Sequence, residues 1–314
     1  MLEVVSVSLG SVSRDTDQVV QILGRDVHVR RVGVGGDLGR ARELISELDG
    51  KVDAFGLGGI DLYVAVRGRR YYFRQALELA RAAKRTPVVC GAGLKDSLER
   101  LTVRALEHEF DIASKRVLMV SAVDRFGMAD ELYQRARSVL FGDLIFALGL
   151  PFPIRTIGSL ERVAHTLMPV IARVPFKWLY PVGEVQEKAP DTEKFARYYA
   201  EADVIAGDWH FIRRYAPKDM AGKVLLTNTT TPADLEFLRQ RGVRTLITTT
   251  PRFNGRSIGT NLLEASLVAI EGAPGELTSE RYAELISTAG IEPAVADLTA
   301  ATEAGVSDAK IMPT

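Results

Sequence analysis

The sequence predicts an α/β protein with two domains, and three observations support this prediction. The chain has 314 residues, which is enough for two domains that each bury a core of their own. Short apolar runs alternate with segments of helical periodicity, a pattern typical of parallel sheets. This alternation stops near residue 150 and resumes near residue 204, which predicts a helical insertion at about 150–200 in the second domain.

The first domain is expected to span residues 1–110 and to be the smaller of the two. Asp37 can cap a helix over 38–48, because its side chain can accept a hydrogen bond from a first-turn N–H group. Strands are predicted at 4–8, 27–34, 52–57 and 87–90, helices at 38–48, 75–83 and 94–108, and a hairpin at 62–73.

The second domain is expected to span residues 111–271, followed by a tail at 272–314 that is either a peripheral helix or partly disordered. A buried strand at 117–120, a helix from about 127 to 137 and a strand at 138–141 form a βαβ unit. Further strands are predicted at 204–206, 224–226 and 245–247, and further helices at 234–241 and 260–270. This order predicts a Rossmann-like, doubly wound sheet.

The loop after the strand at 117–120 departs from the nucleotide-binding fingerprint GxGxxG. The three glycine positions hold Ala122, Asp124 and Gly127, and Arg125 lies between the last two. Asp143 stands about twenty residues further on, where the ribose-binding acid of an NAD site belongs. The Asp124 carboxylate would repel a pyrophosphate. The loop therefore favours a nucleotide-type fold but argues against ordinary NAD binding.

Polar residues follow most of the predicted strands, at the edge where doubly wound sheets bind ligands. Thr227, Asn228 and Thr248 belong to two loops rich in threonine that could hold a phosphate or a polyhydroxylated substrate, although some of these residues could instead cap helices. The predicted ligand-site residues at strand ends are Ser8, Ser11, Asp61, Lys95, Asp124, Arg125, Asp143, Asp208, His210, Thr227, Asn228 and Thr248.

Two alternative general bases stand among these residues. Lys95 follows a Gly-Ala-Gly loop and could act as an acid–base group oriented by Asp61, or it could be a solvated lysine in a first helical turn. Asp208 and His210 would point to the same face of an extended chain, so Asp208 could orient the His210 ring, or it could cap a helix. Two such residues are too few for a metal site, and no metal is predicted.

Composition and charge restrict the partners. Forty basic and forty acidic residues cancel, so no field of one sign recruits nucleic acid or a membrane. The segment 150–190 is apolar and rich in proline, but His165, Arg173 and Lys177 interrupt it, which argues against a membrane span. Its apolar surplus predicts a lid or a homodimer interface. The N-terminus lacks a signal-peptide core, which predicts a cytoplasmic protein.

The last third of the chain resembles the shikimate/quinate dehydrogenase family. The resemblance is carried by residues 202–205, 231–235, 241–245 and 259–265. Residues 56–63 and 120–129 also resemble bacterial proteins named quinate 5-dehydrogenase. The resemblance implies an NAD- or NADP-dependent oxidoreductase acting on a cyclic polyol carboxylate such as quinate or shikimate. It also implies that Ser8, Ser11, Asn261 and Glu264 contact the substrate, and that the loop with Ala122 binds the cofactor.

Three functional hypotheses remain open at this point. The first is the oxidoreductase. The second is a non-redox enzyme on the same scaffold that holds a phosphorylated or sugar-like metabolite, and the third is a non-catalytic protein that binds or senses a small molecule. The family's His-Ser-x-Ser-Pro and Asn-Val-Thr-x-Pro-x-x-Lys segments have no counterpart here, which leaves Lys95 as the nearest catalytic candidate.

Overall fold

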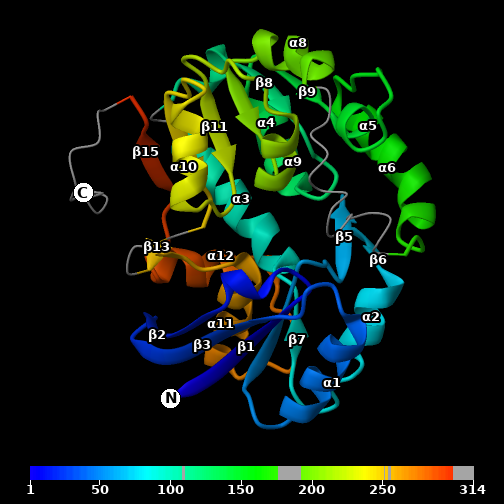
Figure 1. Cartoon of the computed structure of the whole chain (residues 1–314), viewed down its shortest axis with the longest axis vertical. Coiled ribbons are helices and arrows are strands. Elements are labelled where there is room, and N and C mark those ends of the chain that lie inside the picture. Colours follow the sequence, from blue (N-terminus) through cyan, green and yellow to red (C-terminus); the bar gives the residue numbers. More distant parts are fainter. Residues whose placement is uncertain (108–109, 176–191, 251, 254–255, 300–314) are drawn as a thin grey trace. The chain divides into compact units, whose positions relative to one another are not determined.

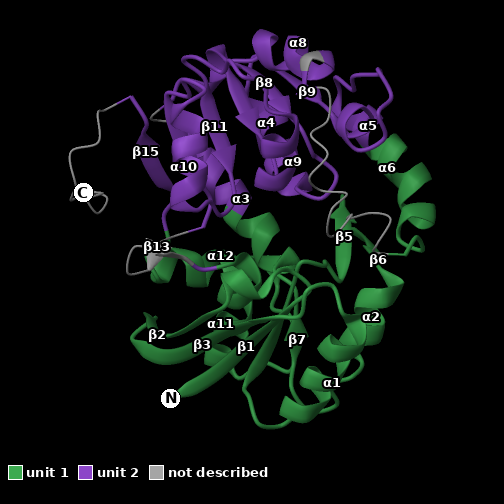
Figure 2. Cartoon of the chain, in the orientation of Figure 1, with its two compact units in different colours: residues 1–98, 161–188, 259–291 green, residues 99–160, 189–258, 292–314 purple. Residues whose placement is uncertain are grey.

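The chain folds into two compact units, each assembled from segments that are distant in sequence (Figure 2). The computed structural model describes residues 1–107, 110–175, 192–250, 252–253 and 256–299. Unit 1 contains residues 1–98, 161–188 and 259–291, and unit 2 contains residues 99–160, 189–258 and 292–314. The contiguous domains predicted from sequence differ from this division mainly at 161–188 and 259–271, which belong to unit 1.

Unit 1 is built on a five-stranded sheet with the order β2-β3-β1-β4-β7. β3, β1, β4 and β7 are parallel, and β2 pairs with β3 in the antiparallel sense at one edge. The strands are β1 (Leu2–Ser8), β2 (Thr16–Ile22), β3 (Arg25–Gly33), β4 (Ala54–Gly58) and β7 (Val88–Val89), and a separate hairpin is formed by β5 (Tyr63–Val66) and β6 (Arg69–Tyr72). The predicted parallel strands and the hairpin are confirmed, whereas β2 was not predicted.

The helices of unit 1 come from both ends of the chain (Figure 1). They are η1 (Val12–Arg14), α1 (Leu38–Leu48), α2 (Arg74–Ala80), the start of α3 (Ala92–Leu106), the end of α6 (Ile157–Ile171), α11 (Thr260–Glu271) and α12 (Ser279–Thr288). α1 has the predicted bounds, and Asp37 Oδ1 accepts a hydrogen bond from the Arg40 N–H at 3.0 Å, so Asp37 is its N-cap as predicted.

Unit 2 is built on a six-stranded sheet with the order β15-β12-β11-β10-β8-β9. The five strands from β12 to β9 are parallel, and β15 pairs with β12 in the antiparallel sense. Their bounds are β8 (Arg116–Met119), β9 (Ser138–Phe141), β10 (Val204–Ala206), β11 (Val224–Thr227), β12 (Thr245–Thr248) and β15 (Ala294–Asp297). β8 has neighbours on both sides, as expected for the first strand of a doubly wound sheet. The strand β15 lies in the segment predicted as a tail.

The remaining elements of unit 2 include the helices that cover this sheet. They are η2 (Ile112–Ser114), α4 (Phe126–Arg135), α5 (Asp143–Phe146), α8 (Glu193–Glu201), α9 (Trp209–Tyr215), α10 (Pro232–Arg239) and the short hairpin β13 (Arg252–Phe253) and β14 (Arg256–Ser257). The predicted helical insertion thus contains α6 and α8. Residues 176–191 lie outside the described residues, so the lid or homodimer interface at 150–190 stays a prediction.

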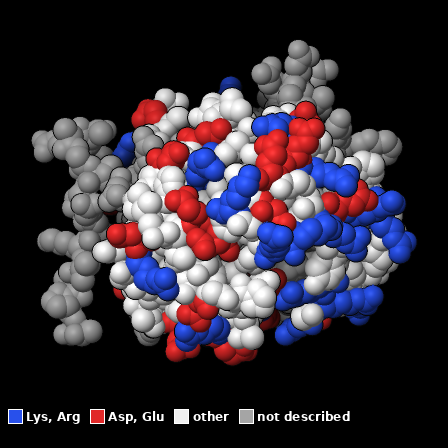
Figure 3. Space-filling model, turned by 90° about the horizontal axis from the view of Figure 1, so that it is seen from below, with Lys and Arg blue, Asp and Glu red and all other residues white. Residues whose placement is uncertain are grey.

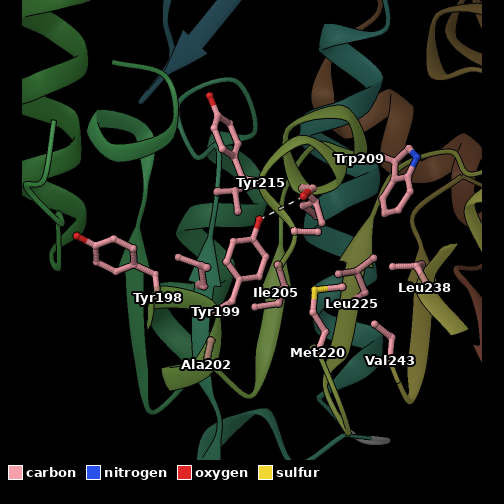
Figure 4. Packing of buried hydrophobic residues seen from close by; sticks show 14 of the residues in the cluster. Tyr198, Tyr199, Ala202, Ile205, Trp209, Tyr215, Met220, Leu225, Leu238 and Val243 are labelled. Carbon is pink, nitrogen blue, oxygen red and sulfur yellow. Dashed lines mark hydrogen bonds between the residues drawn. The ribbon is translucent and has the colours of Figure 1, made fainter. Parts of the chain in front are cut away.

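The core of unit 2 holds α9 against the sheet through buried aromatic residues (Figure 4). Tyr199 is fully buried, and its hydroxyl donates to the Ile212 carbonyl at 3.3 Å. The Tyr215 hydroxyl donates to the Phe146 carbonyl at 2.6 Å. A buried tyrosine stabilises the fold through the apolar area of its ring, and the hydrogen bond of its hydroxyl fixes the orientation of the side chain. The position of the loop that leads into α9 is therefore determined by this core.

The α/β class and the presence of two units with mixed, mostly parallel sheets are confirmed. Within the described part of the chain, no helix combines the length and apolar character needed to cross a bilayer. Acidic and basic side chains are interspersed over much of the face shown in Figure 3.

Close packing of α11 on the sheet of unit 1 depends on glycine in β4. A Cβ added at Gly56 would stand 2.8 Å from the backbone oxygen of Asn261, a distance that forces the helix away from the sheet. We expect Gly56→Ala to lower the free energy of unfolding by about 1–3 kcal/mol in urea titrations. Gly275→Ala is the control, since a Cβ there would meet nothing within 4 Å. Equal stabilities of the two variants would contradict this account.

Candidate functional site

A buried charged network lies at the carboxyl edge of the unit 2 sheet and is centred on Arg125. The Arg125 guanidinium bonds to Glu99 of α3 through Nη1 and to Asp208 Oδ2 through Nη2 at 3.1 Å. Its Nε lies 3.7 Å from Asp124 Oδ2. Arg125 and Glu99 are 4% and 1% exposed, whereas the side chains of Asp208 and Asp124 are 18% and 24% exposed. Solvent therefore reaches the network through two carboxylates.

Backbone geometry brings the ends of β8 and β10 together and positions Asp208. Gly207 has φ +131°, and a Cβ there would stand 2.8 Å from Val120 Cγ2. Because glycine permits this approach, the Asp208 N–H can donate to Ser121 Oγ at 3.2 Å. β9 and β10 lie on opposite sides of the parallel strand β8, so the order in which strands are added to the sheet changes direction here. Such a point is the usual location of ligands in open α/β sheets.

Asn228 extends the network to the end of β11. Its Nδ2 donates to Asp208 Oδ2 at 3.0 Å, and its Oδ1 accepts a hydrogen bond from the Trp209 N–H at 3.0 Å. The structure thus joins four residues that the sequence placed in one ligand site: Asp124, Arg125, Asp208 and Asn228.

The charges in the network stabilise one another. Burial by itself would raise the pKa of the Asp208 carboxyl. The positive charges of Arg125 and His210 have a larger effect in the opposite direction, so the pKa of Asp208 lies below its usual range. Burial by itself would lower the pKa of Arg125, but the nearby carboxylates, Glu99 first, raise it above its ordinary value. Both groups are therefore charged at neutral pH.

The Asp143 carboxylate is hydrogen-bonded to the backbone of the loop after β8. Its Oδ1 accepts hydrogen bonds from the backbone N–H groups of Ala122 and Val123, both at 2.9 Å. These are N–H groups of the loop that was predicted to receive a cofactor. The Oδ2 atom is buried and has no hydrogen-bond partner among the described residues. Burial, with a further contribution from Asp124, raises the pKa of Asp143 to about 6 despite the two backbone bonds.

The other predicted cofactor residues are buried around the same strand ends. Gly127 is buried in α4. Thr227 Oγ1 donates to the Gly207 carbonyl at 2.8 Å. The Thr248 hydroxyl is buried and, within the described part of the chain, has no hydrogen-bond partner. Asp208 accepts a hydrogen bond from the backbone N–H of His210 and caps α9, while the His210 side chain is exposed, so the geometry matches the N-cap interpretation of Asp208.

In unit 1 the structure brings Lys95 and Asp61 together. Lys95 Nζ lies 3.6 Å from Asp61 Oδ1, and both side chains are largely buried. Their catalytic role stays a prediction. Glu264, predicted to contact substrate, is 1% exposed, and its carboxylate accepts hydrogen bonds from the Gly91 and Leu94 N–H groups at the start of α3.

The remaining predicted substrate contacts are engaged within unit 1. Asn261 Nδ2 donates to Ser6 Oγ at 2.6 Å. Ser8 Oγ accepts from Arg31 Nη2 at 2.8 Å. Ser11 caps the short helix η1 and is exposed. These contacts join strands and helices of the same unit, and the predicted substrate contacts stay untested.

Sequence reasoning missed two members of the Arg125 network, Glu99 and Ser121. Glu99 lies in the middle of α3. Charged residues inside a helix ordinarily face solvent, so its burial was not expected. Its burial arises because Arg125 approaches from another element. In the described residues there is no group of three or more His, Cys, Asp or Glu side chains that could hold a metal ion.

These observations define a two-unit α/β protein with a buried charged network at the carboxyl ends of parallel strands. The chain belongs to the family described as Domain of unknown function (DUF8754), whose model matches residues 93–298. A second model, described as Domain of unknown function (DUF8753), matches residues 3–90. A search of the curated proteins finds no match.

Several solved structures of sugar-binding proteins are similar to this chain at low identity. One is the substrate-binding protein of a sugar ABC transport system from Bordetella parapertussis 12822, with 12% identity, coverage of 95% of this chain and 90% of that chain, and a TM-score of 0.42. Another is an ABC transporter solute-binding protein from Agrobacterium vitis with bound D-fucose, with 9% identity, coverage of 93% and 94%, and a TM-score of 0.41.

The resemblance to the shikimate/quinate dehydrogenase family and the oxidoreductase interpretation are wrong. The family models that match this chain over residues 3–90 and 93–298 are the two domains of unknown function named above, and neither is described as a dehydrogenase. Two of the segments that carried the resemblance, residues 231–235 and 259–265, contain residues that cap helices. Thr231 and Asp234 form a capping box at the start of α10, and Glu264 caps α3. Such capping residues occur in many unrelated folds.

The raised pKa of the buried Asp143 carboxylate predicts how the stability of the protein changes with pH. Its pKa of about 6 in the folded state lies above the ordinary 3.8, so the favourable contribution of the protonated form is lost as pH rises from about 4 to about 6. Asparagine keeps an oxygen acceptor for both N–H groups without the charge. We expect Asp143→Asn to raise the free energy of unfolding at pH 8 by about 1–3 kcal/mol, and to change it little at pH 4.

The control for this experiment is Asp203→Asn. Arg116 lowers the pKa of Asp203 to about 2, so the stabilising charge of Asp203 is present at pH 8 and is lost in acid. The asparagine variant should therefore be less stable than the wild type at pH 8. Urea unfolding at both pH values measures the effects, and a destabilised Asp143→Asn at pH 8 would refute the assignment.

Proposed function

We propose that unit 2 binds a small, uncharged, polyhydroxylated molecule, of the sugar or polyol class, at the carboxyl ends of β8, β10 and β11. The observation that carries this proposal is the Arg125 network, in which the exposed groups are the carboxylates of Asp124 and Asp208. Binding without nicotinamide chemistry is the function that this geometry supports best.

The charges of the network disfavour a phosphorylated ligand. Arg125, the cation of the network, is 4% exposed and is bonded to Glu99 and Asp208. A phosphate at this edge would meet the carboxylates of Asp124 and Asp208, which are 24% and 18% exposed, more readily than the Arg125 guanidinium. Like charges at close range in a partly buried place repel strongly, because solvent screens them poorly.

Hydroxyl groups match the hydrogen-bonding capacity of the network. Ionised carboxylates only accept hydrogen bonds, and hydroxyl groups can donate to them. Asn228 Nδ2 carries two N–H groups, of which one is donated to Asp208, and the other can donate to a ligand hydroxyl.

The energetic cost of the network also supports a binding role. Burying a guanidinium and a carboxylate removes both from water, and such pairs often stabilise a fold less than apolar residues of the same volume would. The network holds Asp208 in one orientation through Arg125, Asn228 and the His210 N–H. Pre-orientation of an acceptor lowers the entropy lost when a ligand binds.

We also infer that the unit 2 sheet is doubly wound in the Rossmann-like sense. The chain leaves β8 through α4 to reach β9 on one side, and it reaches β10, β11 and β12 on the other side. Right-handed crossovers in opposite directions place the connecting helices on opposite faces of the sheet.

The test is isothermal titration calorimetry of the full chain with D-galactose, D-ribose and myo-inositol, with their monophosphates, and with NAD and NADP. We expect at least one neutral compound to bind, and its phosphate to bind at least about tenfold more weakly, a difference of about 1.4 kcal/mol. Binding of NAD or NADP stays a prediction that the same titrations examine. A phosphate that binds more tightly than its neutral parent would overturn the proposal.

Asp208→Asn is the matched variant, because it removes the charge and keeps the side-chain shape. Loss of a charged acceptor is expected to weaken binding of the neutral ligand by about 10–100-fold. Asp208→Asn should also reduce the ratio between the affinity for the neutral ligand and the affinity for its monophosphate. Asp219→Asn removes an equal charge from an exposed position of unit 2 and should leave both affinities unchanged.

A further inference from the structure

Two carboxyl groups of unit 1 meet beside Gly93, in the first turn of α3. A Cβ added at Gly93 would stand 2.5 Å from Glu276 Oε1 and 2.7 Å from Glu264 Oε1, so these two oxygens lie within about 5 Å of each other. Glu264 belongs to α11, and Glu276 lies between α11 and α12. The position needs glycine because any side chain would displace both carboxylates.

Glu264 is the buried member of the pair. Its Oε2 accepts a hydrogen bond from the Gly91 N–H at 2.5 Å, and its Oε1 accepts from the Leu94 N–H at 3.1 Å and from the Tyr282 hydroxyl at 2.8 Å. The carboxylate of a distant helix thus satisfies backbone N–H groups at the start of α3, the helix that carries Lys95.

Glu276 is the more exposed member, with 21% of its side chain accessible, and it holds the β5–β6 hairpin. The Tyr63 hydroxyl donates to its Oε1 at 2.7 Å, and Arg70 Nη2 donates to the same oxygen at 2.7 Å. Arg70 also lies over the Tyr63 ring, 4.3 Å from its centroid. The hairpin therefore joins the rest of unit 1 partly through this one carboxylate.

Ionisable groups surround the pair on every side. The groups whose fields act here come from each neighbouring element: Glu264, Glu276, Tyr63, Arg70, Tyr282, Cys90 and Asp61. Arg70 is a partly exposed cation that bonds to Glu276, and Lys95 lies beside Asp61. Two ionised carboxylates with oxygens within about 5 Å of each other would repel through an interior that screens them weakly.

We propose that Glu264 and Glu276 form a carboxyl pair that fastens the β5–β6 hairpin to the start of α3 while Glu264 is protonated. Ionisation of Glu264 releases the Glu276 side. Glu276 is the member that moves, because it is partly exposed and its cationic partner Arg70 is at the surface. Glu264 stays in place, since its three donors are Gly91, just before α3, Leu94 of α3 and Tyr282 of α12.

The surroundings of Glu264 favour its protonated form. Burial has the larger effect, and the negative charge of Glu276 adds a smaller one. Together they raise the pKa of Glu264 to about 7, although its three hydrogen bonds act in the opposite direction. The sign follows from the linkage of proton binding to folding. The folded state holds a proton that the unfolded chain releases above pH 4.5, so unit 1 loses stability as pH rises from about 4.5 to about 7.

The experiment follows glutamate side-chain carbons by NMR in the full chain between about pH 4.5 and pH 9. We expect one carboxyl to titrate near pH 7 in the wild type. Glu276→Gln keeps an acceptor for Tyr63 and removes the neighbouring charge, so it should shift that midpoint down by about one pH unit or more. Glu280→Gln, which removes an exposed charge in α12, should leave the midpoint unchanged.

Hydrogen exchange of residues 63–72 provides the second measurement. After correction for the intrinsic effect of pH, exchange in the wild type should be at least about tenfold faster above the titration than below it. The Glu276→Gln variant should show no such change. The proposal is overturned if no glutamate of the wild type titrates above about pH 6, or if exchange of the hairpin does not respond to pH.

Discussion

The geometry at the carboxyl edge of unit 2 depends on one buried guanidinium. Arg125 is 4% exposed and lies between Glu99 and Asp208. A guanidinium in this position must stay paired, because an isolated buried charge costs far more free energy than a fold of this size can offset. Its planar fork of donors therefore holds α3, the loop after β8 and the loop after β10 in one arrangement.

The same balance of desolvation and pairing explains why the pKa values of carboxyl groups in this protein are shifted in opposite directions. Asp208 faces Arg125, and its pKa is lowered, whereas Asp143 accepts two backbone bonds without a cation, and burial raises its pKa to about 6. Glu264 resembles Asp143, because burial raises its pKa and a neighbouring carboxylate adds to the shift. A cationic partner decides the direction of the pKa shift for Asp208, and burial decides it for Asp143 and Glu264.

The agreement between the predicted and the actual positions of these residues follows from this physics. Asp124, Arg125, Asp208 and Asn228 lie together as expected, because polar residues after parallel strands share one sheet edge, and their role in binding stays a prediction. Glu99 was missed, since a charged residue inside a helix carries no local sign of burial. Asp143 was expected to bind a cofactor, yet its Oδ1 bonds to the Ala122 and Val123 N–H groups, a contact between segments about twenty residues apart.

The sequence by itself determined the α/β class, the order of most strands and helices, and the N-cap of α1 at Asp37, because periodicity and capping depend on neighbouring residues. Only the tertiary structure decided that α11 packs on the sheet of unit 1, that β15 completes the sheet of unit 2, and that Glu264 caps α3. These outcomes depend on contacts between residues far apart in the chain, whose free energy no local pattern contains.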